Sequence, residues 1–386
     1  MPLSESESHQ NLTITLKCFY GFEAVLKEEL EELGYKNITL SNRAVGLKGT
    51  WYDVYFLNLH ARCAISVLVE IARFPFREEK DISHAAMSIQ WSNWFNEQQT
   101  FAVKGAIQTK KVNNTHYPYL LVKDAIVDHF RDSGKERPNI DIKHPKVVVD
   151  LYVTDHEGIL SINTSGLPLF QRGYRNSVGI APLNEVVAAG LIRLSGWDRK
   201  TPFYDPFCGS GTLLIEAALL ACDIPSNIER THYAFKNLSS YQPEMWEEIH
   251  GKAQKVIRAL PCPISGSDHS DEMVLKCRRN LRGFSFGRFI NIEAKDFREV
   301  EKSDAIKFIV TNPPYGERIE IEEADMYGHF GSWLKHEQTG STAWIISAFD
   351  EGMNQIGLKA EAKYQVYNGD LVCSFRKFVT YEGSKK

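Results

Sequence analysis

The sequence predicts an α/β protein of several domains, whose C-terminal half is a doubly wound, mostly parallel sheet. From residue 181 onward, short apolar strands alternate with helices, which is typical of a sheet covered by helices on both faces. One of these strands leads through a tight glycine turn into a helix, and acidic residues follow the ends of successive strands. At 386 residues, the chain also exceeds what a single hydrophobic core usually serves.

The sequence pattern of the N-terminal part predicts a small α+β unit. Residues 1–10 are polar and acidic and predict a disordered tail. The next segments have the patterns of a strand, an amphipathic helix, a strand, a second helix and a strand, at 11–18, 22–33, 44–48, 51–62 and 64–71. We interpret these five segments as belonging to the β-α-β-β-α-β order of a ferredoxin-like unit over residues 11–65.

A second unit is expected over residues 66–165. Its elements are a strand, a helix and two paired strands, at 101–107, 119–130, 147–153 and 159–163. Several glycines and a proline follow, and they place a linker at 166–180.

The regular α/β pattern then covers residues 181–380. Helices are expected at 182–194, 212–221, 244–260 and 271–281, with 223–260 as an insertion. Strands are expected at 203–205, 264–267, 290–294, 306–311, 344–348, 365–366 and 371–375.

The charge pattern excludes a protein that is basic throughout, because the net charge is −4. Residues 104–146, however, hold nine Lys and Arg against five acids. Taken alone, such an excess is typical of a solvated surface; the alternative is nucleic-acid contacts from Lys104, Lys110 and Lys111, which the family resemblance described below favours. In the linker, Arg172, Tyr174 and Arg175 combine cations with a ring, which suits phosphate and base contacts. A linker packed on the third domain would explain the same residues.

The first chemical motif is the glycine turn after the strand at 203–205. Gly209 and Gly211 let a ligand approach the backbone, and the next helix offers unpaired N–H groups. Leu214 stands where a dinucleotide fingerprint needs its third glycine, and no G-K-[ST] follows, so the turn matches neither a nicotinamide nor an ATP site. An acid at the strand end suits a cationic ligand, such as the amino and sulfonium groups of S-adenosylmethionine. The candidate contacts are Asp205, Pro206, Gly209, Gly211 and Thr212.

Two further acids follow the next strands. Asp268 could bind ribose hydroxyls, and Asp296 could accept from an adenine amine, with Phe297 beside it as another candidate contact. Strand ends of a doubly wound sheet converge on one crevice, so the three acids are expected to lie together. A helix N-cap is the alternative for either Asp268 or Asp296 taken alone.

The second motif is Thr311-Asn312-Pro313-Pro314-Tyr315, after an apolar strand. The Asn312 side-chain carbonyl and the Pro313 backbone carbonyl are two acceptors held near each other, because the consecutive prolines stiffen the chain. Two fixed acceptors suit an exocyclic –NH₂ of a base, which Tyr315 could stack against. The motif predicts methyl transfer to a base amine; a strand-ending turn with an exposed aromatic ring is the alternative.

These motifs resemble those of a known family. Asp205–Ala217 (DPFCGSGTLLIEA) and Thr311–Arg318 (TNPPYGER) resemble the THUMP-domain class I methyltransferases, and within them the RlmL branch of guanine-N2 methyltransferases of large-subunit ribosomal RNA. Phe170–Arg175 (FQRGYR) and Ala181–Glu185 (APLNE) also match that branch. The resemblance implies a Rossmann-like class I methyltransferase domain preceded by ferredoxin-like and THUMP α+β domains.

The resemblance also implies a function. It assigns S-adenosylmethionine as cofactor, held by Asp205, Gly209, Gly211, Asp268 and Asp296, and 23S ribosomal RNA or a large-subunit precursor as partner. The catalytic candidates are Asn312, Pro313, Pro314 and Tyr315, of which Asn312 also lies at the cofactor. Some relatives carry a second, fused methyltransferase domain; since this chain ends at Lys386, we expect that second activity to be absent.

Other readings stay open at this point. The same amine chemistry fits a tRNA guanine-N2 methyltransferase or a DNA adenine-N6 methyltransferase, and a non-catalytic RNA-binding factor is a further alternative. Seven cysteines without a C-x-x-C pair make a metal site or disulfide framework unexpected, and Cys208 is interpreted as a small buried residue rather than a nucleophile. With neither an apolar span nor a signal sequence, we expect a cytoplasmic protein without membrane contact, of undetermined oligomeric state.

Overall fold

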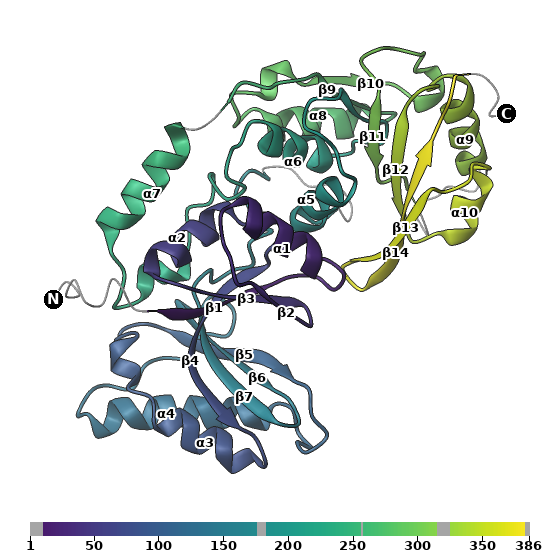
Figure 1. The fold of residues 1–386 in the computed structure, drawn as a ribbon. Helices are drawn as coiled ribbons and strands as arrows, with labels where there is room; N and C mark the ends of the chain where they lie inside the picture. The colour runs from purple at the N-terminus through teal and green to yellow at the C-terminus, as the bar shows by residue number, and fades with distance from the viewer. Residues whose placement is uncertain (1–10, 176–182, 256–257, 315–324, 383–386) are drawn as a thin grey trace. The chain divides into compact units, whose positions relative to one another are not determined.

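The computed structural model describes residues 11–175, 183–255, 258–314 and 325–382, which form two compact units (Figure 1). The first unit comprises 11–18, Leu30–Leu169 and Arg230–Lys252, and the second comprises the described parts of Phe19–Glu29, Phe170–Glu229 and Ala253–Lys386. The expected tail at 1–10 lies outside the described residues, as does Tyr315.

The first unit is built on one seven-stranded sheet. Its strands are β1 (Leu12–Lys17), β2 (Thr39–Ser41), β3 (Ala44–Gly49), β4 (Ser66–Pro75), β5 (Phe101–Ile107), β6 (Val147–Val153) and β7 (Glu157–Asn163). They lie in the order β2-β3-β1-β4-β7-β6-β5, with β5 and β6 parallel and the other pairs antiparallel. Because β4 pairs with β1 on one side and with β7 on the other, the expected ferredoxin-like and THUMP parts share a single sheet.

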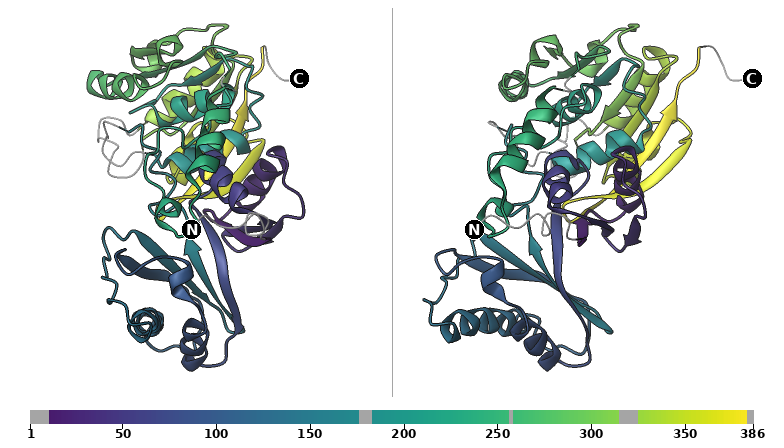
Figure 2. Two further views of the ribbon diagram at one scale, coloured as in Figure 1. Left: turned by 90° about the vertical axis from the view of Figure 1, so that its left-hand side faces the viewer. Right: turned by 60° about the vertical axis from the view of Figure 1, so that its left-hand side comes forward.

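Helices α2 (Trp51–His60), α3 (Glu79–Met87) and α4 (Tyr117–Asp132) belong to this unit, and α3 and α4 pack side by side (Figures 1 and 2). Helices α1 (Glu23–Glu32) and α7 (Pro243–Lys255) contribute only in part. The segment Arg230–Lys252 is joined to the unit by aromatic packing. The ring of Phe235 lies 4.6 Å from that of Tyr55 on α2 and 5.2 Å from that of Trp246 on α7.

The second unit is built on another seven-stranded sheet, which confirms the predicted doubly wound, mostly parallel arrangement. Its strands are β8 (Phe203–Asp205), β9 (Ile264–Asp268), β10 (Asn291–Ala294), β11 (Phe308–Thr311), β12 (Thr342–Ser347), β13 (Ala362–Asn368) and β14 (Leu371–Val379). The order is β10-β9-β8-β11-β12-β14-β13, in which the first five strands are parallel and β14 runs antiparallel to both β12 and β13.

Helices cover both faces of this sheet. In Figure 1, α5 (Glu185–Leu194), α6 (Thr212–Ala221) and α8 (Asp271–Leu281) lie on one face, and α9 (Met326–His336) and α10 (Asp350–Gln355) on the other. The core beneath α9 is rich in aromatic side chains: Tyr204, Phe297, Tyr327, Phe330, Trp333 and Phe378 are all buried there. Their burial anchors the loops that follow the strands.

Candidate cofactor and catalytic site

The site lies where the strand order of the second sheet reverses. Strands β8 and β11 are parallel neighbours, paired through Phe203–Phe308 and Tyr204–Ile309. After β8 the chain continues outward to β9 and β10, and after β11 it continues in the other direction to β12. Crevices at the carboxyl ends of strands form at such reversal points. The ends of β8 and β11 carry the Asp205 motif and the Asn312 motif, so both sequence motifs lie at the carboxyl ends of neighbouring strands, where such a crevice is expected.

Asp205 is a buried carboxylate without a cation partner in the described part of the chain. It is 1% exposed, and Oδ1 accepts from the Thr311 hydroxyl at 2.6 Å and from the Phe207 amide at 3.1 Å. Burial raises the pKa of Asp205 to about 7, and the negative charge of Asp268 adds to the rise. A buried carboxylate whose Oδ2 accepts no bond from a described residue suits a ligand that brings a positive charge.

The glycine turn uses left-handed backbone conformations, and at Gly211 there is no room for a side chain. Gly209 and Gly211 have φ of 52° and 88°, and a Cβ on Gly211 would lie 2.5 Å from the Cys277 sulfur. Gly211 is also the N-cap of α6 and offers no side-chain acceptor, so the first N–H groups of that helix remain available to a ligand. Pro206 is buried at the start of the turn, and the pKa of the Cys208 thiol is raised well above its usual value by a hydrogen bond to Cys277 and by burial.

Asp268 lies at the same turn. Its Oδ2 accepts from the Gly209 amide at 2.9 Å and its Oδ1 from the Ser270 amide at 3.0 Å, while Ser270 is the residue that caps α8. Ser270, and not Asp268, is therefore the N-cap of α8. This carboxylate holds the turn in place at the end of β9.

Asp296 and Phe297 are placed differently. Asp296 caps the short 3-10 helix Phe297–Glu299, and its two oxygens pair with the guanidinium of Arg298 at 2.7 and 2.8 Å, which lowers the pKa of Asp296. The Phe297 ring is buried in the core against Phe207 and Phe330. Because its ring belongs to the core, the backbone of Phe297 is the part left to contact a cofactor.

The Asn312 motif begins at the end of β11. The side-chain oxygen of Asn312 is buried and accepts no hydrogen bond from the residues that the structure describes. Pro313 is buried, and the Pro314 carbonyl accepts from the Tyr327 hydroxyl at 3.2 Å. A buried acceptor without a donor is costly, which is typical of a site that a ligand completes.

Two residues at this site were missed from sequence. Thr311 was named as the first residue of the Asn312 motif but was given no role, and Tyr327 lies in α9, a helix for which no prediction was made. Thr311 directly precedes Asn312, so a polar residue at the tip of an apolar strand was a usable signal. No local sequence pattern distinguishes Tyr327 as a residue of this site.

The linker residues lie against the second unit. Arg172 and Tyr174 are 1% and 4% exposed, and both bind the buried Glu216 of α6. Arg175 pairs with Glu185 at 3.0 Å and donates to the Thr212 hydroxyl at 3.1 Å. The expectation that Arg172 and Tyr174 contact RNA is therefore corrected: buried side chains bound to a carboxylate cannot reach a polyanion, and the packed-linker alternative describes them.

The lysines expected to bind nucleic acid lie in the first unit. Lys104 is on β5 and is exposed, as is Lys110 in the loop after it. Lys111 is exposed and donates to the Asp155 carbonyl at 2.6 Å. Their charges face solvent, as a contact with phosphate requires.

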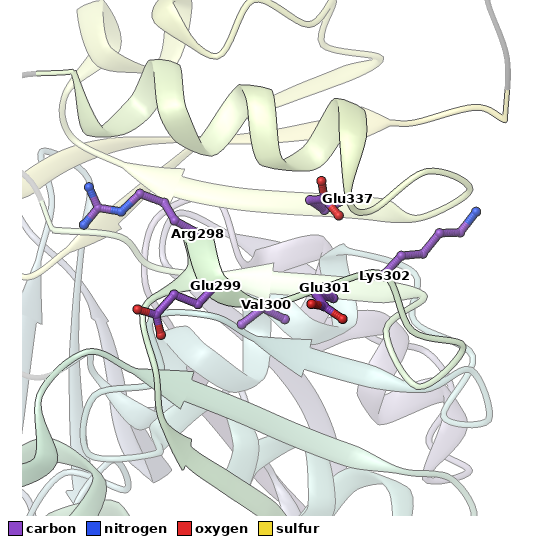
Figure 3. A pocket seen from close by; sticks show the side chains of 6 residues that line it. All are labelled: Arg298, Glu299, Val300, Glu301, Lys302 and Glu337. Atoms are coloured by element: carbon purple, nitrogen blue, oxygen red, sulfur yellow. The ribbon is translucent and has the colours of Figure 1, made fainter.

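A separate hollow of about 550 Å³ lies beside the 3-10 helix Phe297–Glu299 (Figure 3). It is lined by Arg298, Glu299, Val300, Glu301, Lys302 and Glu337, and Arg298 and Lys302 point apart at its two ends. None of the site residues described above lines it, and we assign it no role.

Within the four described ranges, no cluster of three His, Cys, Asp or Glu side chains is arranged to hold a metal ion, and no helix has the length and apolar character needed to cross a bilayer.

A parallel sheet that closes with an antiparallel hairpin, and that carries a glycine turn after the strand at its reversal point, is the fold of class I methyltransferases. The order β10-β9-β8-β11-β12-β14-β13 gives this chain that fold. The chain belongs to the UPF0020 family (RMKL-like, methyltransferase domain), whose model matches residues 172–377. A THUMP domain matches residues 76–163, and an RlmL ferredoxin-like domain matches residues 13–68.

Relatives agree with this membership. The chain is 34% identical over 97% of its length to the ribosomal RNA large subunit methyltransferase K/L of Aliivibrio salmonicida, and it spans about half the length of such relatives, 54% in this case. It is 32% identical to a putative RNA methyltransferase of Synechocystis, slr0064, over 94% of this chain and 95% of the relative. Among solved structures, SMU.472, a putative methyltransferase complexed with SAH (S-adenosylhomocysteine), matches this chain with a TM-score of 0.85 and 25% identity. The match covers 97% of this chain and 100% of the other.

Proposed function

We propose that this protein methylates the exocyclic N2 amine of a guanine in RNA, with S-adenosylmethionine as methyl donor and 23S ribosomal RNA as substrate. Family membership, the class I fold and the THUMP match support a methyltransferase that acts on RNA. The names of the relatives favour large-subunit ribosomal RNA.

The observation that carries the proposal is the side-chain oxygen of Asn312, which is buried and accepts no hydrogen bond from a described residue. An exocyclic amine is a poor nucleophile, because its lone pair is delocalised into the base. Asn312 Oδ1 and the Pro313 carbonyl each accept one N–H of the amine, which directs the lone pair toward the methyl group. The Pro314 carbonyl is already bound by Tyr327, so Pro313 supplies the second acceptor.

The residues of the turn fit the proposed cofactor. Asp205 supplies the buried negative charge for the cationic methionine end, and the N–H groups at the start of α6, where Thr212 is the first residue, follow directly after the same turn. Pro206, Gly209 and Gly211 shape the turn, while Asp268 takes the ribose. Asp296 and the backbone of Phe297 take the adenine, with Arg298 holding the Asp296 carboxylate. When bound, the cofactor supplies an electrophilic methyl group on a sulfonium.

For RNA binding, we assign Lys104, Lys110 and Lys111 to phosphate contacts and Tyr315 to stacking on the flipped-out base. Arg175 is half-buried and bound to Glu185 and Thr212, so its proposed role is at the turn rather than at RNA. A tRNA guanine and a DNA adenine present the same –NH₂ to Asn312. The THUMP match favours RNA over DNA, and the donor-free Asn312 oxygen argues against a purely RNA-binding factor.

The test is a methyl-transfer assay with labelled S-adenosylmethionine and the full chain. Undermodified 23S ribosomal RNA, unmodified tRNA and duplex DNA are compared, and the products are digested to nucleosides. We expect N2-methylguanosine from the ribosomal RNA alone. Label in tRNA or in DNA adenine would transfer the assignment to that substrate, and no label in any of them would leave the non-catalytic alternative.

A further inference from the structure

Thr311 joins the two halves of the site. It is the last residue of β11, is fully buried, and directly precedes Asn312. Its hydroxyl lies 2.6 Å from Oδ1 of Asp205, at the end of the neighbouring strand β8. One side chain thus connects the carboxylate proposed for the cofactor to the backbone that carries the proposed catalytic amide.

The hydrogen bond has a direction. Asp205 in its charged form can only accept, so the single hydroxyl proton of Thr311 points at Oδ1. The Phe207 amide also donates to Oδ1, which leaves Oδ2 to a ligand. Both bonds stabilise the charged carboxylate, and they act against the burial that raises the pKa of Asp205.

The groups around Asp205 determine how much its charged form depends on the Thr311 hydroxyl. Asp268 faces it from β9 and adds negative charge, and Cys208 and Tyr204 lie nearby with their protons in place. The Tyr204 phenol is bound to the Ser267 hydroxyl rather than to Asp205. Among the described residues, no Lys, Arg or His pairs with Asp205, and burial opposes its charge. The largest effect that lowers the pKa of Asp205 is the Thr311 hydrogen bond.

We propose that Thr311 is a positioning residue that keeps Asp205 charged and oriented for the cofactor, and so ties cofactor affinity to the placement of Asn312. The inference rests on the proposed function, because it takes the cationic methionine end of S-adenosylmethionine or its product as the ligand of Asp205. The cation then replaces the missing positive partner of this carboxylate, while Thr311 stays bound to Oδ1.

The experiment measures SAH binding to the full chain by calorimetry from about pH 5.5 to about pH 9, a range that brackets the titration of Asp205. Three proteins are compared: wild type, Thr311→Val, which keeps the shape but loses the hydroxyl, and Thr311→Ser, which keeps it. Because titration of the ligand itself is common to all three, the variants are compared with wild type at each pH. Thermal melts establish the folded fraction used in each titration.

We expect wild-type affinity to rise with pH and level off above about pH 7, since the charged carboxylate binds the cation. Thr311→Val should move the midpoint upward by about one pH unit and weaken binding roughly tenfold near neutral pH. Thr311→Ser should restore the wild-type profile, which a role in shape alone would not predict. A Thr311→Val profile that coincides with wild type would overturn the inference and leave the proposed function standing. A wild-type protein that binds no SAH at any pH would overturn both.

Discussion

The phenol of Tyr327, on α9, lies 3.2 Å from the carbonyl oxygen of Pro314 and 2.7 Å from the hydroxyl of Ser347 at the end of β12. Tyr327 is buried, so these two hydrogen bonds hold the second proline of the Asn312 motif in place. With the Pro314 carbonyl engaged, the acceptors left to an incoming amine are those of Asn312 and Pro313.

Replacing Tyr327 by Phe removes the donor to Pro314 and keeps the ring packed on Phe349. We expect the turnover number to fall roughly 3- to 10-fold, because a hydrogen bond of about 1 kcal/mol no longer restrains the motif. SAH affinity should not change, because the phenol of Tyr327 binds Pro314 and Ser347 rather than a residue proposed to hold the cofactor. Single-turnover kinetics beside a binding titration measure both; an unchanged turnover number would remove the positioning role of this phenol.

Replacing Asn312 by Ala removes the buried acceptor. Turnover should fall roughly 100- to 1000-fold, as for the loss of one preorganised polar contact in other active sites, while SAH binding remains measurable. Asn291→Ala, at an exposed asparagine of β10, is the matched control and should keep full activity. Undiminished turnover in Asn312→Ala would dismiss the proposed chemistry.

Replacing Asp205 by Asn should stabilise the protein without ligand above neutral pH. The folded state holds the Asp205 proton up to about pH 7, whereas the unfolded chain releases it near pH 4, so the wild type loses stability as pH rises between these values. Asn cannot ionise and can still accept from Thr311. From about pH 5 to about pH 8, we expect the variant to gain up to about 3 kcal/mol relative to wild type, seen as a rising difference in melting temperature. SAH affinity should fall in the same variant, and equal melting temperatures at pH 8 would show that burial does not penalise this charge.

Replacing Arg172 by Ala leaves Glu216 buried without its cation, since both side chains are 0% exposed. The free energy of unfolding should fall by about 3–5 kcal/mol, as is usual for a broken buried ion pair. The exposed pair Arg131–Asp128 provides the control, and Arg131→Ala should cost less than about 1 kcal/mol. Urea titrations give both values. Loss of RNA affinity in fully folded Arg172→Ala, with normal stability, would reinstate Arg172 as an RNA contact.

Changing Lys110 and Lys111 to Glu tests the basic surface of the first unit. RNA affinity should fall at least about tenfold at low salt and much less at high salt, because counterion release supplies the binding energy. The same change at Lys200 and Lys359, exposed lysines of the second unit, is the control. Filter binding across a salt series measures the slopes; a loss that is independent of salt would speak against phosphate contacts.

Much of the fold followed from local signals. Helices α6 and α8 begin and end at the predicted residues, because Gly211 and Ser270 are strong start signals before apolar periodic runs. Strands β5 and β6 also match, because each is a run of apolar and β-branched residues. The three-residue strand β2, whose residues are all exposed, and the helices α3, α9 and α10 were not predicted. The residues of an exposed strand do not alternate between apolar and polar in a way that marks it. Helix α9 does begin after an Asp, Asp325, but that side chain makes no capping hydrogen bond.

The site was foreseen in its motifs but not in its contacts. Asp205, Asp268 and Asn312 were singled out as chemistry at strand ends, and the sheet brings the first and last to neighbouring strands. The sequence could not show that Arg172 would form a buried ion pair with Glu216, because the two residues lie far apart in the chain. Nor could it show that Arg230–Lys252 packs with the first unit, because long-range packing leaves no local pattern.

The shared strand β4 has a consequence for how this protein can be divided and recombined. Leu68 and Val69 face both β1 and β7 in the hydrogen-bonded register, so a cut between the two N-terminal family matches would split one strand ladder and expose two new edges. The downstream segment Arg230–Lys252 supplies Phe235 and Trp246 to the same body. The N-terminal half should therefore be inherited, swapped or grafted only as a whole, together with a stretch of sequence that is encoded inside the methyltransferase domain.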